Sequence, residues 1–427
     1  MTSTATEYLA QAERAAAEHP ELVGVTPRSI RSMGVIGAGT MGAGIAIAGL
    51  DAGFDVTLIE VGIDALERGR TRIADFYADR VRRGKLVETD ARDRMSRLTA
   101  SVELQRLASV DLVIEAVFED IEIKKELFGR LDGVVKDGAI LASNTSYLDL
   151  DAMAAATKRS GDVVGLHFFS PANVMKLLEI VRGRETSRET LATALAFANR
   201  LGKLPVVSAN AWGFIGNRIH SQYRRQCEFM LEEGATPEQV DAAMEAFGYA
   251  MGPFKVADLS GLDIAWRIRK SQLAANNGVR DPDVRSVDFP DTLCEMGRFG
   301  RKTGAGYYRY SPDGKSPISD PEVVDIIERS SATKGIVRRP FTDDEIQRRA
   351  LLTMVNEASR LLGEGVAARP SDVDVVMANG YGFPRSEGGP VHWARQRDPV
   401  DLDRDLDWLA RASGPGFIRG DFIKEPR

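Results

Sequence analysis

The sequence is poor in cysteine and has no long hydrophobic run. Two cysteines, Cys227 and Cys294, stand among 427 residues, which is too few for a disulfide framework and favours a cytoplasmic location. The nearest approach to a membrane span, GVIGAGTMGAGIAIAGL, is too rich in glycine, so no membrane insertion is expected. The N-terminal stretch MTSTATEYLAQAERAAAEHPELVG has neither a basic start nor an apolar centre, so no secretory signal is expected.

An excess of basic charge is missing as well. The net charge of −6 argues against a general nucleic-acid binder. Hydrophobic residues make up 43% and charged residues 28% of the chain, as in ordinary globular proteins, and the length suggests two or three domains. We expect neither a nucleic-acid partner nor a metal site.

Apolar strands alternate with helical patterns from about residue 31. The strand-like segments are SMGVIGAG, DVTLIEV, VDLVIEAV, GAILASNTS and VVGLHFFSP. Such alternation, with continuously apolar strands, predicts a parallel sheet covered by helices on both faces. After about residue 209 the pattern becomes helical. There residues 232–254 resemble residues 363–391 in the order of their Gly, Pro and Val-Asp positions, which suggests a duplicated helical domain.

A glycine-rich turn follows the first of these strands. Gly37, Gly39 and Gly42, with Thr40 and Met41 between them, match the dinucleotide-binding pattern G-x-G-x-x-G. The strand before the motif and the helical stretch after it supply the context that the pattern requires. Gly37 would allow the tight turn, Gly39 the approach of a pyrophosphate, and Gly42 close packing of helix on strand. A flavin site, or a turn needed only for packing, would share this pattern.

Glu60 ends the second strand, DVTLIEV. Its distance from the glycines is that of the carboxylate that binds a ribose 2′-hydroxyl in dinucleotide-binding domains. A carboxylate at this position would repel a 2′-phosphate. The sequence therefore favours NAD over NADP as the cofactor.

Four polar residues stand at the ends of later elements. They are Ser146, His167, Glu179 and Asn217. In a doubly wound sheet, ligands bind beyond the carboxyl ends of the strands, where we place Ser146 and His167. A histidine inside VVGLHFFSP is otherwise a core residue bonded to a carbonyl. Considered alone, Glu179 would be interpreted as a core carboxylate and Asn217 as a helix cap.

The stretches around these residues resemble the 3-hydroxyacyl-CoA dehydrogenases. The resemblance is carried, in matching order, by SNTS, LHFFSP, MKLLEIV, GFIGNR, GYAMGPF and FGRKTGAGYY. It implies the reversible NAD-dependent oxidation of an (S)-3-hydroxyacyl-CoA to the 3-oxoacyl-CoA. His167 would then take the hydroxyl proton and Glu179 would orient its ring. Ser146 and Asn217 would hydrogen-bond the substrate oxygens.

The resemblance also implies further contacts with NAD. They would be made by Glu119, Lys124, Ser146, Ser170 and Lys302. For Glu119 and Lys124 the alternative is a solvated charge pair at a helix start, and for Lys302 an ordinary loop position.

Three positions depart from the family's pattern. Ser170 stands where the family usually has an asparagine. Tyr147 stands where a small residue is usual, so we hypothesise that its ring reshapes the acyl pocket. Trp212 replaces a common proline.

The fold class expected is a Rossmann-type α/β N-terminal domain followed by two all-α, duplicated C-terminal domains. The predicted boundaries are a linker-like helix (1–30), the NAD-binding domain (31–208), a first helical domain (209–312), a linker (313–340) and a second helical domain (341–427). The whole resembles the dehydrogenase half of multifunctional fatty-acid β-oxidation enzymes, in which a helix like 1–30 follows an enoyl-CoA hydratase.

Three further expectations concern substrate and assembly. With an acyl-CoA as substrate, we expect a monomer whose two helical domains pair as an internal pseudo-dimer, with possible docking to a separate hydratase. The second helical copy lacks a His–Glu pair and is interpreted as structural. A dehydrogenase of a free 3-hydroxy acid or sugar acid, and a non-catalytic NAD-binding relative, are the alternatives in function.

Overall fold

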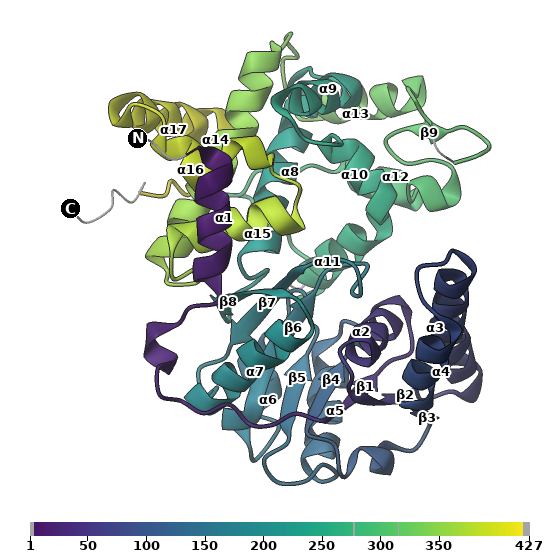
Figure 1. The fold of residues 1–427 in the computed structure, drawn as a ribbon. Helices are drawn as coiled ribbons and strands as arrows, with labels where there is room; N and C mark the ends of the chain where they lie inside the picture. The colour runs from purple at the N-terminus through teal and green to yellow at the C-terminus, as the bar shows by residue number, and fades with distance from the viewer. Residues whose placement is uncertain (1–3, 276–277, 315, 422–427) are drawn as a thin grey trace. The chain divides into compact units, whose positions relative to one another are not determined.

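A computed structural model describes residues 4–275, 278–314 and 316–421. They form two compact units, one made of residues up to Arg218 together with Glu364–Tyr381, the other of Ile219–Gly363 together with the residues from Gly382 onward. The first unit is α/β (Figure 1). The described part of the second is helical apart from a hairpin of two-residue strands, β9 (Arg309–Tyr310) and β10 (Pro317–Ile318). The predicted fold class is therefore confirmed.

The first unit is built on an eight-stranded sheet with the order β3-β2-β1-β4-β5-β6-β7-β8. The strands are β1 (Ser32–Ile36), β2 (Asp55–Ile59), β3 (Leu98–Ser101), β4 (Leu112–Glu115), β5 (Ile140–Ser143), β6 (Val163–Phe168), β7 (Leu177–Arg182) and β8 (Leu204–Ala209). The first six are parallel, whereas β7 runs antiparallel to β6 and β8 parallel to β7. Strands β3 and β8 and the reversal at β7 are not predicted from the sequence.

Helices cover both faces of this sheet, as predicted. One face carries α2 (Thr40–Asp51), α3 (Ile63–Arg82) and α7 (Arg188–Arg200), with α4 (Glu88–Ser96) against β3. The other carries α5 (Ile121–Asp132) and α6 (Leu150–Ala154). Two apolar cores result, and the central strands are apolar on both faces because each side is buried.

The helical region repeats one order of elements. Helices α8 (Gly216–Glu233), α9 (Pro237–Phe247) and α10 (Pro253–Ser260) correspond to α14 (Asp343–Gly363), α15 (Pro370–Gly380) and α16 (Pro390–Arg395). The remaining helices are α11 (Leu262–Ala275), α12 (Phe289–Glu295), α13 (Pro321–Thr333) and α17 (Pro399–Ser413). The N-cap of α9 is Thr236, whose side chain accepts a hydrogen bond from the Gln239 amide at 3.2 Å.

The first compact unit departs from the predicted boundaries because it includes the N-terminal helix and continues to Arg218 instead of residue 208. Two further differences lie later in the chain. Residues 313–340, predicted as a linker, contain α13, which begins at a capping Asp320 and buries Val323, Ile326 and Ile327. Their spacing is helical, and the turn-forming residues before them obscured it. The second difference is α15, which belongs to the first unit although it lies in the second copy of the repeat.

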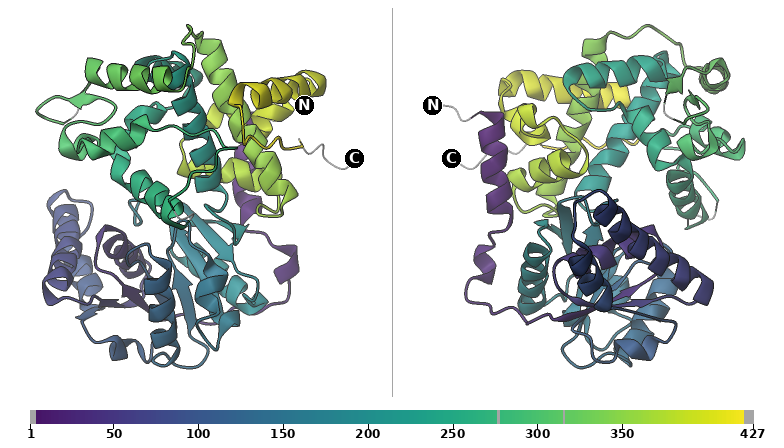
Figure 2. Two further views of the ribbon diagram at one scale, coloured as in Figure 1. Left: turned by 180° about the vertical axis from the view of Figure 1, so that it is seen from behind. Right: turned by 45° about the vertical axis from the view of Figure 1, so that its right-hand side comes forward.

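An N-terminal helix, α1 (Ala5–Ala16), packs against α15 and β8 (Figures 1 and 2). Its buried face consists of Leu9, Ala12 and Ala16. The Tyr8 hydroxyl donates to Asp374 on α15 at 2.7 Å. The apolar face of α1 is thus used within its own unit, and the predicted hydratase docking and the predicted monomer stay predictions. In the described part of the chain, no helix combines the length and apolarity that a membrane crossing needs.

Candidate active site

The glycine-rich turn after β1 has the geometry of a phosphate-binding loop. Gly37 has φ +99°, and a Cβ there would lie 2.6 Å from the Ala116 carbonyl oxygen. A Cβ on Gly42 would lie 1.7 Å from the Gly37 oxygen. A Cβ on Gly39, by contrast, would meet nothing within 4 Å. Packing therefore demands the first and last glycine, while Gly39 leaves an open approach to the backbone.

Helix α2 begins in this loop without a side-chain cap. Gly39 is its N-cap, and Thr40 and Met41 form the start of its first turn. The Glu60 carboxylate accepts hydrogen bonds from the amides of Ala38 at 2.9 Å and Val61 at 2.8 Å. An uncapped helix start attracts phosphate, and a carboxylate at this place suits a ribose hydroxyl. These residues therefore fit NAD.

His167 and Glu179 face each other across the reversed strand pair. The antiparallel register of β6 and β7 makes them direct partners, and His167 Nδ1 lies 2.9 Å from Glu179 Oε2. Both side chains are buried, with 5% and 0% of their residues' surface exposed. The other carboxylate oxygen accepts hydrogen bonds from the amides of Ile215 (3.1 Å) and Gly216 (3.2 Å), where α8 begins. The carboxylate is held from both sides.

This arrangement assigns the tautomer of the neutral imidazole. A carboxylate only accepts hydrogen bonds, so Nδ1 carries the proton and Nε2 has a free lone pair. The rings of Phe169 and Phe214 flank the imidazole, with centroids 4.6 Å and 5.6 Å away. His167 is thus placed to accept a proton through Nε2.

Asn217 links the start of α8 to Ser146, just beyond β5. Its Nδ2 donates to the Ser146 carbonyl oxygen at 3.3 Å. On its other side, Oδ1 lies 2.8 Å from the hydroxyl of Tyr381, a residue of the C-terminal repeat. The sequence analysis misses Tyr381, because only the fold brings it to a residue 164 positions away.

An ionic cluster of Glu115, Glu119 and Lys124 adjoins Ser146, and its members Glu115 and Lys124 are buried. Glu119 Oε1 accepts hydrogen bonds from the Thr145 hydroxyl at 2.6 Å and the Ser146 amide at 2.7 Å. Lys124, only 1% exposed, lies 3.2 Å from Glu119 and 2.8 Å from both oxygens of the fully buried Glu115. Lys124 is therefore not a solvated charge, whereas the Glu119 side chain is 35% exposed.

Glu115 is a residue that the sequence analysis misses. It also accepts hydrogen bonds from the Ser143 hydroxyl and the Val117 amide. The sequence does contain a pattern that indicates this residue, because Glu115 is a carboxylate within the apolar segment VDLVIEAV, as Glu179 is within MKLLEIV. Together with its partners, Glu115 fixes the ends of β4 and β5.

Two predicted cofactor contacts remain, Ser170 and Lys302. Ser170 is exposed just past β6. Lys302 belongs to the second unit, where it pairs with Asp263. Their roles stay predictions.

Two of the departures from the family's pattern touch each other. The rings of Tyr147 and Trp212 lie 5.1 Å apart at an angle of 40°. Trp212 is 40% exposed, so the pair presents an aromatic surface next to Ser146.

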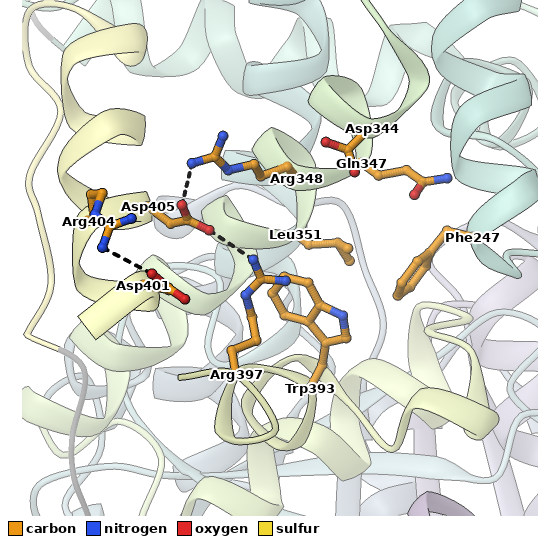
Figure 3. Close-up of a pocket in the computed structure, with 10 residues that line it drawn as sticks. All are labelled: Phe247, Asp344, Gln347, Arg348, Leu351, Trp393, Arg397, Asp401, Arg404 and Asp405. Atoms are coloured by element: carbon orange, nitrogen blue, oxygen red, sulfur yellow. Dashed lines mark hydrogen bonds and ion pairs between the residues drawn. The ribbon is translucent and has the colours of Figure 1, made fainter. Parts of the chain in front are cut away.

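A hollow in the second unit is lined by residues of the second repeat copy and of α17, together with Phe247 of α9 (Figure 3). Arg348 stands roughly where Asn217 stands in the first copy, and it pairs with Asp405 on α17. Arg397 lies 3.0 Å from the same carboxylate. Both guanidinium groups also sit over tryptophan rings. Arg348 and Arg397 both form ion pairs with Asp405, and neither of these pairs resembles His167–Glu179.

Two family models match the chain. The model for the "3-hydroxyacyl-CoA dehydrogenase, NAD binding domain" matches residues 32–211. The model for the "3-hydroxyacyl-CoA dehydrogenase, C-terminal domain" matches residues 213–310 and 346–396, the two segments that carry the repeat.

Proteins of known name are similar over most of the chain. The "Peroxisomal bifunctional enzyme" of Danio rerio is 43% identical over 401 residues, which are 90% of this chain and 53% of that protein. The chain spans about half the length of the curated relatives it matches. The solved 3-hydroxybutyryl-CoA dehydrogenase of Escherichia coli is 28% identical, covering 90% of this chain and 95% of its own, with a TM-score of 0.74. The (S)-3-hydroxybutyryl-CoA dehydrogenase of Ralstonia eutropha is 35% identical, covering 66% and 100%, with a TM-score of 0.62.

These names overturn the prediction of a cytoplasmic location. The curated relatives from animals and plants are named peroxisomal or glyoxysomal. The prediction rested on the shortage of cysteine. That shortage marks a reducing environment but does not distinguish one reducing compartment from another.

Proposed function

Because the chain belongs to the 3-hydroxyacyl-CoA dehydrogenase family, we propose that it catalyses the reversible NAD-dependent oxidation of an (S)-3-hydroxyacyl-CoA to a 3-oxoacyl-CoA. One observation carries the proposal: His167 is buried, and its Nδ1 is bonded to a carboxylate that two backbone amides hold. The other ring nitrogen, Nε2, is then left to act as a proton acceptor.

In the proposed reaction, Nε2 of His167 accepts the proton of the 3-hydroxyl group. NAD, when bound, supplies the nicotinamide ring that takes the hydride from C3. The Glu179 carboxylate stabilises the imidazolium ion that forms, and the hydrogen bonds that it accepts from the Ile215 and Gly216 amides hold it in position. In the reverse direction, the same nitrogen returns the proton to the carbonyl oxygen.

Substrate orientation is assigned to Ser146 and Asn217. In this proposal the side chains of both hydrogen-bond the substrate oxygens; the support is that Glu119 holds Ser146 through its backbone amide. Such positioning supplies a large part of the rate in a hydride transfer. Glu119, Lys124, Ser170 and Lys302 remain proposed contacts of the cofactor.

The test is the oxidation of NADH by acetoacetyl-CoA, followed at the nicotinamide absorbance band. We expect turnover, and we expect free coenzyme A to compete with the substrate. An active enzyme on which free coenzyme A has no effect would instead indicate a free 3-hydroxy acid as the substrate. Absence of turnover with 3-oxoacyl-CoA thioesters of short, medium and long chain would overturn the proposal.

Cofactor preference is predicted to depend on Glu60. In the Glu60→Gln variant the hydrogen bond to Ala38 can persist, but the charge that repels a 2′-phosphate is gone. We expect the ratio of kcat/KM for NADP over NAD to rise at least about tenfold, since one unscreened charge pair contributes on the order of a few kcal/mol. The comparison of both cofactors in steady-state kinetics checks this, and an unchanged ratio would contradict it.

Chain-length preference is predicted to depend on Tyr147. The Tyr147→Ser variant removes one ring of the aromatic pair with Trp212, so we expect the ratio of kcat/KM for long over short acyl chains to change by about tenfold. Trp212→Phe keeps a ring in contact and serves as the control, with a smaller change. An identical profile across a series of acyl-CoA substrates would refute the hypothesis.

A further inference from the structure

Tyr381 brings a hydroxyl group from the C-terminal repeat into the candidate active site. It directly follows α15, and its hydroxyl lies 2.8 Å from Asn217 Oδ1. We propose that Tyr381 is a positioning residue, whose hydroxyl fixes the orientation of the Asn217 amide and strengthens it as a donor. The inference rests on the proposed function of Asn217, and it gives the second repeat copy an active role rather than a purely structural one.

The hydrogen-bond pattern determines which way the amide points. A carbonyl oxygen only accepts hydrogen bonds, so the group of Asn217 that faces the Ser146 oxygen at 3.3 Å is Nδ2. The side-chain oxygen then faces Tyr381, and the phenol must be the donor. One amide N–H is used by Ser146, and within the described residues the second is left for a substrate oxygen.

The hydrogen bond from the Tyr381 hydroxyl also makes the second N–H of Asn217 a stronger hydrogen-bond donor. A hydrogen bond accepted by an amide oxygen polarises the amide and makes its N–H groups better donors. Burial raises the pKa of Tyr381 well above its usual range. The phenol therefore stays protonated, and remains a donor, at the pH of any assay near neutrality.

The ring of Tyr381 is held tightly enough to impose this geometry. It lies against Gly216, where a Cβ would come within 2.2 Å of a ring carbon. It also meets the ring of Phe169 edge-on, at 5.7 Å between centroids, and Phe169 in turn contacts His167. Gly216 and Phe169 thus both contact the catalytic pair, since the Gly216 amide donates to Glu179 and the Phe169 ring lies against His167.

Helix α15 is itself anchored away from the site, which offers a matched control. The Tyr8 hydroxyl on α1 donates to Asp374 of α15 at 2.7 Å. Tyr8→Phe removes a phenolic hydrogen bond and loosens the same helix, but it touches neither Asn217 nor the substrate. Tyr381→Phe removes the hydroxyl at the site and keeps the ring.

The experiment is a double-substitution cycle in the acetoacetyl-CoA assay. We expect Tyr381→Phe to lower kcat about tenfold with little change in the KM for NADH, and Tyr8→Phe to stay within about twofold of the unmodified chain. In an Asn217→Ala background, Tyr381→Phe is expected to have almost no additional effect, because its influence passes through Asn217.

The outcomes separate this inference from the proposed function. Equal kcat values for Tyr381→Phe and Tyr8→Phe, or a full additional loss in the Asn217→Ala background, would overturn the inference while turnover of the unmodified chain upholds the function. If the unmodified chain shows no turnover, the proposed function fails, and the Tm of the same single and double variants is measured in place of kcat. Non-additive lowering by the Tyr381 and Asn217 substitutions then supports the coupling, and additive lowering overturns it.

Discussion

Replacement of His167 by alanine is expected to lower kcat for acetoacetyl-CoA reduction by about 10³-fold, within the range that general acid–base catalysis contributes. The substitution removes Nε2, the atom proposed to exchange a proton with the substrate oxygen. NADH binding should persist, because the glycine loop and Glu60 lie on other strands. Steady-state turnover and an NADH titration by fluorescence measure the two effects separately.

A companion substitution tests the mechanism more sharply. Glu179→Gln keeps the size of the side chain but turns one of its two acceptors into a donor. Either the backbone amides of Ile215 and Gly216 or the Nδ1 proton of His167 then meets an N–H group. If the amide donates to Nδ1, the ring proton moves to Nε2, which can no longer accept. We expect a loss of about 10²-fold or more, and retention of a tenth of the original kcat in either variant would contradict the assignment.

Replacement of Lys124 by methionine is expected to destabilise the protein by about 3–5 kcal/mol, the cost of leaving a buried charge without its partner. Methionine fills similar space but leaves the Glu115 carboxylate, fully buried between β4 and α5, without its cation. Urea unfolding followed by circular dichroism measures the effect. Activity should fall as well, since Lys124 also binds Glu119, which holds Ser146.

The neighbouring lysine is the matched control. Lys125 pairs with Glu122 at 2.9 Å on the same helix, but its side chain is 39% exposed. Lys125→Met is expected to change the free energy of unfolding by no more than about 0.5 kcal/mol. Adding Glu115→Gln to Lys124→Met should restore part of the lost stability. Equal effects of the two lysine substitutions would show that burial of the charge is not the cause.

The sequence predicts best the parts of the site whose chemistry lies close together along the chain. Gly37, Gly39 and Gly42 form one turn, and His167 and Glu179 lie twelve residues apart in two apolar segments. A charged residue in an apolar strand needs a partner, so each predicts the other. Glu115 is also a charged residue in an apolar strand, but its partner Lys124 lies on a helix whose sequence alone suggests a solvent-exposed charge.

What the sequence does not predict depends on long-range packing. The residues around Tyr381 in the sequence do not indicate a role in the site, because its contact with Asn217 depends on the return of α15 to the first unit. Strand β8 contains a proline and is apolar only in part, and β3 is half exposed. Each becomes a strand because its neighbour in the sheet supplies the hydrogen bonds. Helix α13 was hidden by the turn-forming residues before it.

The return of α15 has a consequence for the order in which the chain folds during synthesis. The last two residues of β8 pair with residues 366–367, through a hydrogen bond from the Ala209 amide to the Val366 carbonyl and a bridge between Ser208 and Ala367. A nascent chain that has left the ribosome as far as residue 210 therefore presents an open strand edge, which invites pairing with other chains. The α/β unit stays in this vulnerable state while the ribosome adds more than 150 further residues. Chaperone binding to stalled nascent chains should accordingly last until α15 emerges.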